Sequence, residues 1–349
     1  MTSTQNPELV RKKNRYYYRH LGGFRRELRE ALPREVLREL HQRSAWRHFR
    51  TLLRQLVIAA AAVYGVTYNS LWIWLPGSLV LGFVIFDFTV LLHEAVHNLI
   101  FAAGRPRLNA LMGWLYALPS GISRTQFTRW HLDHHDELGS NTGDPKRAHL
   151  TPKIVKRWYK FLYMTPALFP IYFRAAAREA KTYPAALRKQ IQRERWITIA
   201  LHLAAMSALL GWGGVGLYFK LYAVPYFFVF PVAFTINRAG QHYNVNPKDI
   251  AQWSTMMKGS WFWDFVYLNS NYHLEHHYFP GVPFYNLPRL QQCLWPLYER
   301  HGMKYQTYGK VLHGWFIENR APHTDWSLPS DLPDTAAVAQ TPSPTRFRP

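Results

Sequence analysis

The chain has 349 residues, of which 48% are hydrophobic, and its 42 Lys and Arg against 21 Asp and Glu give a formal net charge of +21. Nucleic acid, anionic lipid or an acidic protein could each match that charge. No nucleic-acid-binding motif accompanies it, so we expect no nucleic-acid partner. The single cysteine, Cys293, excludes an intrachain disulfide.

The first 54 residues form a basic region directly before the first apolar stretch. Between residues 11 and 54 there are fourteen Lys or Arg against four acids. With Tyr16, Tyr17, Tyr18 and Trp46 as aromatic anchors, this region is predicted to lie on the cytosolic membrane surface against anionic headgroups. Because this region is basic and polar and not apolar, we expect no cleavable signal peptide in it.

Four nearly uncharged stretches then predict an all-α, polytopic membrane protein with about four spans in two hairpins. They are residues 55–75, 77–92, 196–219 and 221–236. The first hairpin is expected to start near Gln55, turn near Pro76 and finish near Phe101. The second is expected to turn within residues 211–216. Both would return the chain to the cytosol, beneath a helical cap.

Two shorter apolar stretches are predicted to be interfacial or re-entrant. Residues 108–120 are too few to span. Residues 158–173 are interrupted by Lys160, Pro166 and Pro170, and a span there would place the second and third histidine clusters described next on opposite sides of the membrane. The predicted membrane domain therefore covers residues 55–320, and the Pro-, Ser- and Thr-containing residues 321–349 are predicted to be a disordered tail.

Three short clusters contain eight of the 17 histidines. Residues three and four apart share one face of a helix, so each cluster can direct its imidazoles at one point. Neutral imidazole binds iron, zinc and copper, and eight of them exceed what one four-coordinate zinc can use. The clusters therefore predict two metal ions. They are His93-Glu-Ala-Val-His97, His131-Leu-Asp-His134-His135 and His273-Leu-Glu-His276-His277.

Other classes of protein fit parts of this pattern. Residues 93–97 alone match the zinc-protease motif, in which two histidines bind zinc and the glutamate is a general base. A catalytic zinc takes three protein ligands, so two further clusters disfavour that class. A metal-dependent membrane receptor or chaperone is a second alternative, which would need no oxygen chemistry. Zinc rather than iron in the purified protein would distinguish a protease from the other classes.

The clusters resemble the three histidine boxes of the integral-membrane fatty acid desaturase and hydroxylase superfamily. The resemblance covers about residues 80–320 and is closest to the sphingolipid Δ4-type lipid desaturases. Residues 271–280, Asn-Tyr-His-Leu-Glu-His-His-Tyr-Phe-Pro, match the third box of that branch with its following Phe-Pro. Residues 93–97, with Asn98 and Phe101, are similar to its first box.

This resemblance implies a diiron centre that activates O2, with the box histidines as ligands and a ninth histidine upstream of the third box, a position that His242 fits. Asn237 would contact a metal through water, although the Δ4-type branch has histidine there. Glu94, Glu275, Asp144 and Asp264 are candidates to accept the outer N–H of a ligand histidine, as is Asp133, for which a solvated position is equally expected. The implied ligands are His93, His97, His131, His134, His135, His242, His273, His276 and His277.

The expected reaction is O2-dependent introduction of a double bond into a long acyl chain of a lipid. No side-chain acid or base can remove hydrogen from an unactivated methylene, so a metal cofactor must carry the chemistry. Hydroxylation or ketolation of a fatty acid, lipid or carotenoid is the alternative, because the superfamily shares one metal cage across these reactions.

Electrons are expected from a separate donor of the ferredoxin or cytochrome b5 type with its reductase. Residues 20–23, His-Leu-Gly-Gly, loosely resemble a cytochrome b5 haem turn, but too little chain precedes them for a haem domain. Basic cytosolic segments, such as those around Lys156 and Lys181, are expected either to steer an acidic donor or to bind lipid headgroups.

Overall fold

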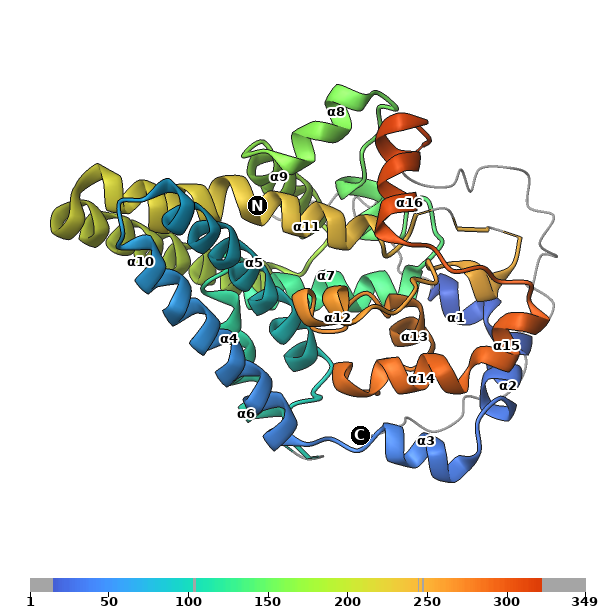
Figure 1. The fold of residues 1–349 in the computed structure, drawn as a ribbon. Helices are drawn as coiled ribbons and strands as arrows, with labels where there is room; N and C mark the ends of the chain where they lie inside the picture. Colours follow the sequence, from blue (N-terminus) through green and yellow to red (C-terminus); the bar gives the residue numbers. More distant parts are fainter. Residues whose placement is uncertain (1–14, 103–104, 244, 247, 322–349) are drawn as a thin grey trace, which may run out of the picture.

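The computed structural model describes residues 15–102, 105–243, 245–246 and 248–321. Within these residues the secondary structure is helical, apart from one isolated bridge between Met257 and Gln306. Figure 1 shows α4, α5 and α10 together on one side of the molecule, α2, α14 and α15 on the opposite side, and α7 between them. The all-α expectation is confirmed. The predicted tail, from residue 322 onward, lies outside the described residues.

The N-terminal helices pack onto the protein instead of lying as a separate surface region. They are α1 (Tyr16–His20), α2 (Gly22–Glu30) and α3 (Arg34–Leu40). Leu21, Phe24 and Leu28 are buried in the main hydrophobic core. Tyr17, expected to be a membrane anchor, is 2% exposed and its ring centroid lies 6.4 Å from that of His277. That expectation was wrong for Tyr17, because its aromatic ring fills space over the third histidine cluster.

The first hairpin consists of α4 (Ala45–Val66) and α5 (Leu71–Val96). Its turn lies at residues 67–70 and not at Pro76, which sits inside α5. The Thr67 hydroxyl donates to the Tyr64 carbonyl at 2.6 Å, the local bonding by which Thr, Asn and Ser favour turns. Helix α4 also starts ten residues before Gln55, so residues 45–54 are its first turns.

The two short apolar stretches form no membrane-length helix. Helix α6 (Pro106–Ala117) has 12 residues, about 18 Å, against a hydrocarbon core of about 30 Å. Residues 157–180 are divided into α8 (Arg157–Phe161), the 3-10 helix η3 (Leu162–Met164) and α9 (Leu168–Ala180). No continuous spanning helix therefore separates the second histidine cluster from the third in this segment.

The second hairpin is formed by α10 (Ala185–Tyr218), the π-helix η4 (Phe219–Val229) and α11 (Phe230–Ala239). Gly214, with φ 65° and ψ −170°, breaks the helix inside the predicted turn. The two legs then pack together, since His202 Nδ1 lies 2.7 Å from the Tyr222 hydroxyl. Among the described residues three helical stretches are long and apolar enough to cross a membrane, namely Ala45–Val66, Leu71–Val96 and the reversed Ala185–Ala239.

Short helices form the rest of the protein around a core that includes the fully buried Trp253, Tyr267 and Tyr298. We call these elements, with α1–α3, the cap. They are α7 (Arg124–Glu137), η2 (Lys146–Leu150), η5 (Ile250–Gln252), α12 (Trp261–Val266), α13 (His273–Tyr278), η6 (Phe284–Asn286), α14 (Leu287–Cys293), α15 (Trp295–Arg300), α16 (Tyr308–Leu312) and η7 (His313–Ile317).

Candidate metal centre

Helix α7 carries the second histidine cluster and is anchored at its start. The Ser123 side chain caps it by accepting from the Gln126 N–H at 3.1 Å. Ser123 Oγ also donates to Glu194 of α10 at 2.6 Å, and the Thr125 N–H donates to the same oxygen at 2.9 Å. The carboxylate thus fixes the N-terminal end of α7 against the second hairpin.

Helix α13 carries the third cluster and is positioned by Asp264 from α12. The Tyr272 hydroxyl donates to Asp264 Oδ2 at 2.8 Å, and Asn271 Nδ2 donates to Oδ1 at 2.9 Å. Both donors immediately precede His273. Asp264 was predicted to support a ligand histidine directly, but its hydrogen bonds hold the segment that leads into the cluster.

The nine predicted histidines meet in two groups. The five-histidine group combines α5, α7 and α13, and its ligand nitrogens lie within 4.8 Å of one another. His131 Nε2 lies 2.7 Å from His97 Nε2 and 2.9 Å from His135 Nε2. His276 Nε2 lies 2.9 Å from His135 Nε2. The members are His93, His97, His131, His135 and His276.

The four-histidine group combines α7, α13 and the segment after α11, and all of its members are buried. His242 Nε2 lies 3.0 Å from His134 Nε2 and 3.1 Å from His273 Nε2. His277 Nε2 lies 3.1 Å from His273 Nε2. His242, the ninth candidate, therefore joins its group as the resemblance implied. The members are His134, His242, His273 and His277.

These contacts fit metal ions better than hydrogen bonds. An imidazole nitrogen has one in-plane site, either a proton or a lone pair, so His131 Nε2 cannot bond fully to two other Nε2 atoms. Two nitrogens each about 2.1 Å from one ion and at right angles lie about 3.0 Å apart, the separation observed. Burial lowers the pKa of the α7 and α13 box histidines well below the usual range, which favours the neutral form that binds metals.

Two of the candidate acids contact box histidines. Asp144 Oδ1 lies 2.9 Å from His134 Nδ1 and also accepts from the Lys146 N–H at 2.9 Å. Glu94 Oε1 lies 3.7 Å from His93 Nδ1, while its Oε2 accepts from the Phe284 N–H at 3.1 Å. Both carboxylates are buried, and Asp144 has the geometry that fixes a ligand imidazole through its outer nitrogen.

The other candidates have different contacts. Glu275 Oε1 accepts from Tyr298 at 2.6 Å and from Gln291 at 2.8 Å, and no described box histidine bonds to it. Asn237 donates to Ser270 Oγ at 2.8 Å and accepts from Gln241 at 2.9 Å. Asp133 is buried and pairs with Arg129 at 3.0 Å. These contacts therefore position residues around the histidines and not the imidazoles themselves.

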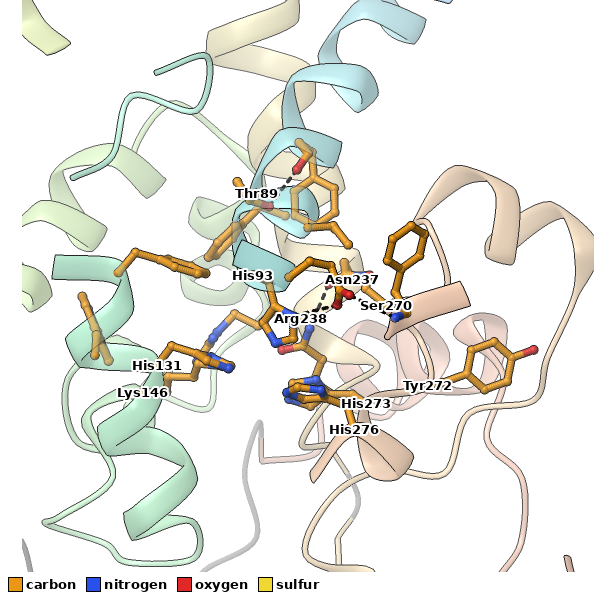
Figure 2. A pocket seen from close by; sticks show the side chains of 18 of the residues that line it. Thr89, His93, His131, Lys146, Asn237, Arg238, Ser270, Tyr272, His273 and His276 are labelled. Atoms are coloured by element: carbon orange, nitrogen blue, oxygen red, sulfur yellow. Dashed lines mark hydrogen bonds and ion pairs between the residues drawn. The ribbon is translucent and has the colours of Figure 1, made fainter. Parts of the chain in front are cut away.

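A cavity opens beside the five-histidine group (Figure 2). Three members of that group line it, His93, His131 and His276, whereas His273 is the one member of the four-histidine group that does. A second, largely apolar cavity shares four of its lining residues and leads on toward Ser120 and Leu168. The shared residues are Thr89, Phe127, Tyr172 and Phe234.

Two charged residues in this cavity wall, Lys146 and Arg238, were not anticipated from the sequence. Arg238 follows the apolar stretch 221–236 directly, where a single arginine resembles an ordinary membrane-end anchor. Lys146 belongs to a polar segment with no recognisable motif. The one indication of Lys146 in the sequence is that it lies two residues after Asp144, a candidate partner of a ligand histidine.

Comparison with known proteins agrees with this geometry. Human sphingolipid delta(4)-desaturase/C4-monooxygenase DES2 is 26% identical over 253 residues, covering 68% of this chain and 70% of the relative. Sphingolipid delta(4)-desaturase DES1 of Xenopus tropicalis is 26% identical over 258 residues, covering 71% and 72%. The DES1 of Drosophila melanogaster is 24% identical over 276 residues, covering 78% and 82%. A family model, described as fatty acid desaturase, matches residues 69–309, which include all nine histidines. The chain belongs to the fatty acid desaturase family, and it is a membrane-associated oxidoreductase that acts on lipid.

Proposed function

We propose that this protein introduces a double bond into a long acyl chain of a lipid, using two iron ions held by the two histidine groups. The observation that carries this proposal is the convergence of nine histidines beside an apolar cavity. An all-nitrogen ligand set suits iron. The bound irons would supply the activation of O2 that removes hydrogen from an unactivated methylene.

The chain's own residues would bind the acyl chain and keep water away from it. Phe86, Phe127 and Phe234 contribute apolar surface to the first cavity, and Phe127 and Phe234 also line the second. Such a lining would bind methylenes through the hydrophobic effect, with the reacting carbon beside the histidines that line the same cavity, among them His93 and His276.

The names of the relatives support a sphingolipid substrate, since those relatives are sphingolipid delta(4)-desaturases. The name of human DES2 also includes C4-monooxygenase, which favours hydroxylation as the second candidate reaction. Both reactions start from the same hydrogen removal, so one histidine cage can serve either.

We infer a multi-pass topology with the cap on the cytosolic side. The fourteen basic residues between positions 11 and 54 favour that side for the start of α4, and two hairpins return the chain to it. Cysteines placed at Ser140 and Tyr285 should react with a membrane-impermeant reagent from the same face. Labelling from opposite faces would contradict this topology.

A separate electron donor of the ferredoxin or cytochrome b5 type remains part of the proposal. Lys160 is unavailable to it, because its Nζ donates to the Trp315 and Arg320 carbonyls. Arg178, Lys181 and Arg188 are exposed. Their reversal to Glu, together with Lys189, should lower turnover at limiting donor and spare it at saturating donor. A loss that persists at saturation would indicate headgroup binding instead.

The reaction is tested by lipid mass spectrometry in a host that lacks its own desaturases, with and without this chain. We expect an acyl product two mass units lighter than its precursor, and about two irons per purified chain. A product sixteen units heavier would establish the hydroxylase alternative. A single zinc per chain would refute the diiron proposal.

A further inference from the structure

Two positively charged side chains lie in the cavity wall beside the histidines (Figure 2): Lys146 from η2 and Arg238 from the end of α11. Within the described part of the chain, neither the Lys146 ammonium nor the Arg238 guanidinium forms a side-chain hydrogen bond or an ion pair. Both residues are partly buried, and a basic side chain that lines a largely apolar cavity without a bonded carboxylate is stabilised by an anionic ligand.

Two carboxyl groups lie near the cations. Glu94 lines the same cavity, and its Oε2 already accepts from the Phe284 N–H at 3.1 Å. Asp144 is the carboxylate whose charge acts on both cations, and its Oδ1 is already bonded to His134 Nδ1. Neutral imidazoles bring no negative charge to the metal ions they would hold. Burial and the charge of Arg238 together lower the pKa of Lys146 well below its usual range. An anion between the two side chains would remove this penalty.

The cavity wall combines polar and apolar side chains. Asn237, Gln241 and Ser270 are joined by hydrogen bonds in the same wall as Arg238. The aromatic residues that continue into the second cavity, Phe127 and Phe234, form the apolar part. A ligand that fits this division has an anionic group attached to a long hydrocarbon chain.

We propose that Lys146 and Arg238 bind an anionic group of the lipid substrate, a carboxylate, phosphate or sulfonate, next to the histidines. This inference rests on the proposed function for the identity of the ligand as substrate. Because the two cations and His131, His273 and His276 border one cavity, the oxidised carbon lies close to the anionic group and the remaining chain extends toward Ser120.

The test measures equilibrium binding to the metal-loaded protein in nanodiscs of phosphatidylcholine. Four probes of equal chain length are compared: hexadecanoate, hexadecyl phosphate, hexadecanesulfonate and neutral hexadecanol. The wild type should bind at least one anionic probe about tenfold more tightly than hexadecanol, the gain expected of a charged hydrogen-bond pair. The best of the three anions identifies the group.

The double variant Lys146→Met, Arg238→Met should lose this preference and bind hexadecanol within about twofold of wild type. A matched pair of exposed residues on the cap, Arg26→Met with Lys310→Met, should keep the preference. If the double variant cannot be purified, Lys146→Gln and Arg238→Gln alone should each reduce the preference about threefold.

Equal binding of all four probes by the wild type, or a preference that survives loss of both cations, would overturn the anion site. This assay needs no turnover. An absent anion preference with an intact desaturated product would refute the inference alone, whereas anion binding without any oxidised lipid would refute the proposed function and leave the site in place.

Discussion

The two histidine groups differ in what surrounds them. The five-histidine group takes His93 from the membrane-length helix α5 and His97 from the residue that follows it, and presents three members to the cavity. The four-histidine group comes from α7, α13 and the segment after α11, is fully buried, and presents His273 alone.

Their outer nitrogens differ only in part. In the four-histidine group, Asp144 Oδ1 lies 2.9 Å from His134 Nδ1, and the Trp253 carbonyl lies 3.4 Å from His242 Nδ1. Among the described residues, His277 Nδ1 of the same group has no hydrogen-bond partner, and neither do His131 Nδ1 and His276 Nδ1 of the five-histidine group. The clearest difference is therefore access: three members of the five-histidine group line the cavity, and one member of the four-histidine group does.

The strongest test of this difference removes one histidine from each group. His134→Ala and His131→Ala should each lower turnover more than about a hundredfold, since each deletes a direct ligand. Elemental analysis should show about one iron in place of about two for each variant. Full turnover in either variant, or a wild-type metal content, would contradict the assignment of that histidine.

Asp144→Asn should weaken the four-histidine group selectively. Loss of the carboxylate that faces His134 Nδ1 is expected to reduce metal affinity there by roughly ten- to a hundredfold. Metal retention during a chelator titration measures the effect. Glu275→Gln is the matched control, because its described hydrogen bonds reach Tyr298 and Gln291. Equal metal loss in both variants would show that Asp144 supports metal binding no more directly than Glu275 does.

Thr89→Phe should affect substrate and leave the metals in place. Thr89 lines both cavities, and its hydroxyl donates only to the Phe86 carbonyl of its own helix. A phenyl ring there narrows the junction between the two cavities, at an overpacking cost of about 1–3 kcal/mol. Turnover of long acyl chains should therefore fall roughly tenfold, whereas turnover of shorter chains should be unchanged. Val80→Phe, on the exposed face of α5, is the control.

The smallest effects on activity are expected from histidines outside both groups. His202→Gln should keep its metal content but lower the melting temperature, because His202 contacts Tyr222 and the Leu118 carbonyl and each lost bond costs about 1 kcal/mol. His313 forms an exposed ion pair with Glu318, so the free energy of unfolding of His313→Gln should stay within about 0.5 kcal/mol of the wild-type value. Thermal unfolding distinguishes the two; loss of iron in either would enlarge the proposed ligand set.

The sequence predicted the helical class and eight of the histidines that meet in the two groups. The expectation that each cluster directs its imidazoles at one point was wrong for the second cluster, because His134 joins one group and His131 and His135 the other. The third cluster is divided likewise, since adjacent residues point about 100° apart around a helix. His242 belongs to none of the clusters and was found only through the family resemblance. The predicted turn at Pro76 was wrong: Pro76 lies inside α5, and the chain reverses at residues 67–70, where the Thr67 hydroxyl donates to the Tyr64 carbonyl.

Tertiary contacts explain the remaining differences. Burial of Tyr17 against His277 depends on how α1 docks, which no local pattern encodes. Lys146 and Arg238 are 92 positions apart in the numbering and face the same cavity only after η2 and α11 have packed. The Asp264 hydrogen bonds to Asn271 and Tyr272 likewise require the irregular turn that precedes α13.

The five-histidine group joins residues that leave the ribosome far apart in time. His93 and His97 are made with the first hairpin, but His276 follows nearly two hundred residues later. At about 5–20 residues per second, α5 must stay in the bilayer for roughly ten to forty seconds before its metal site can close. A nascent chain truncated before residue 273 would lack the third cluster and so both complete sites, which makes metal incorporation, under the proposed function, a late step of biogenesis.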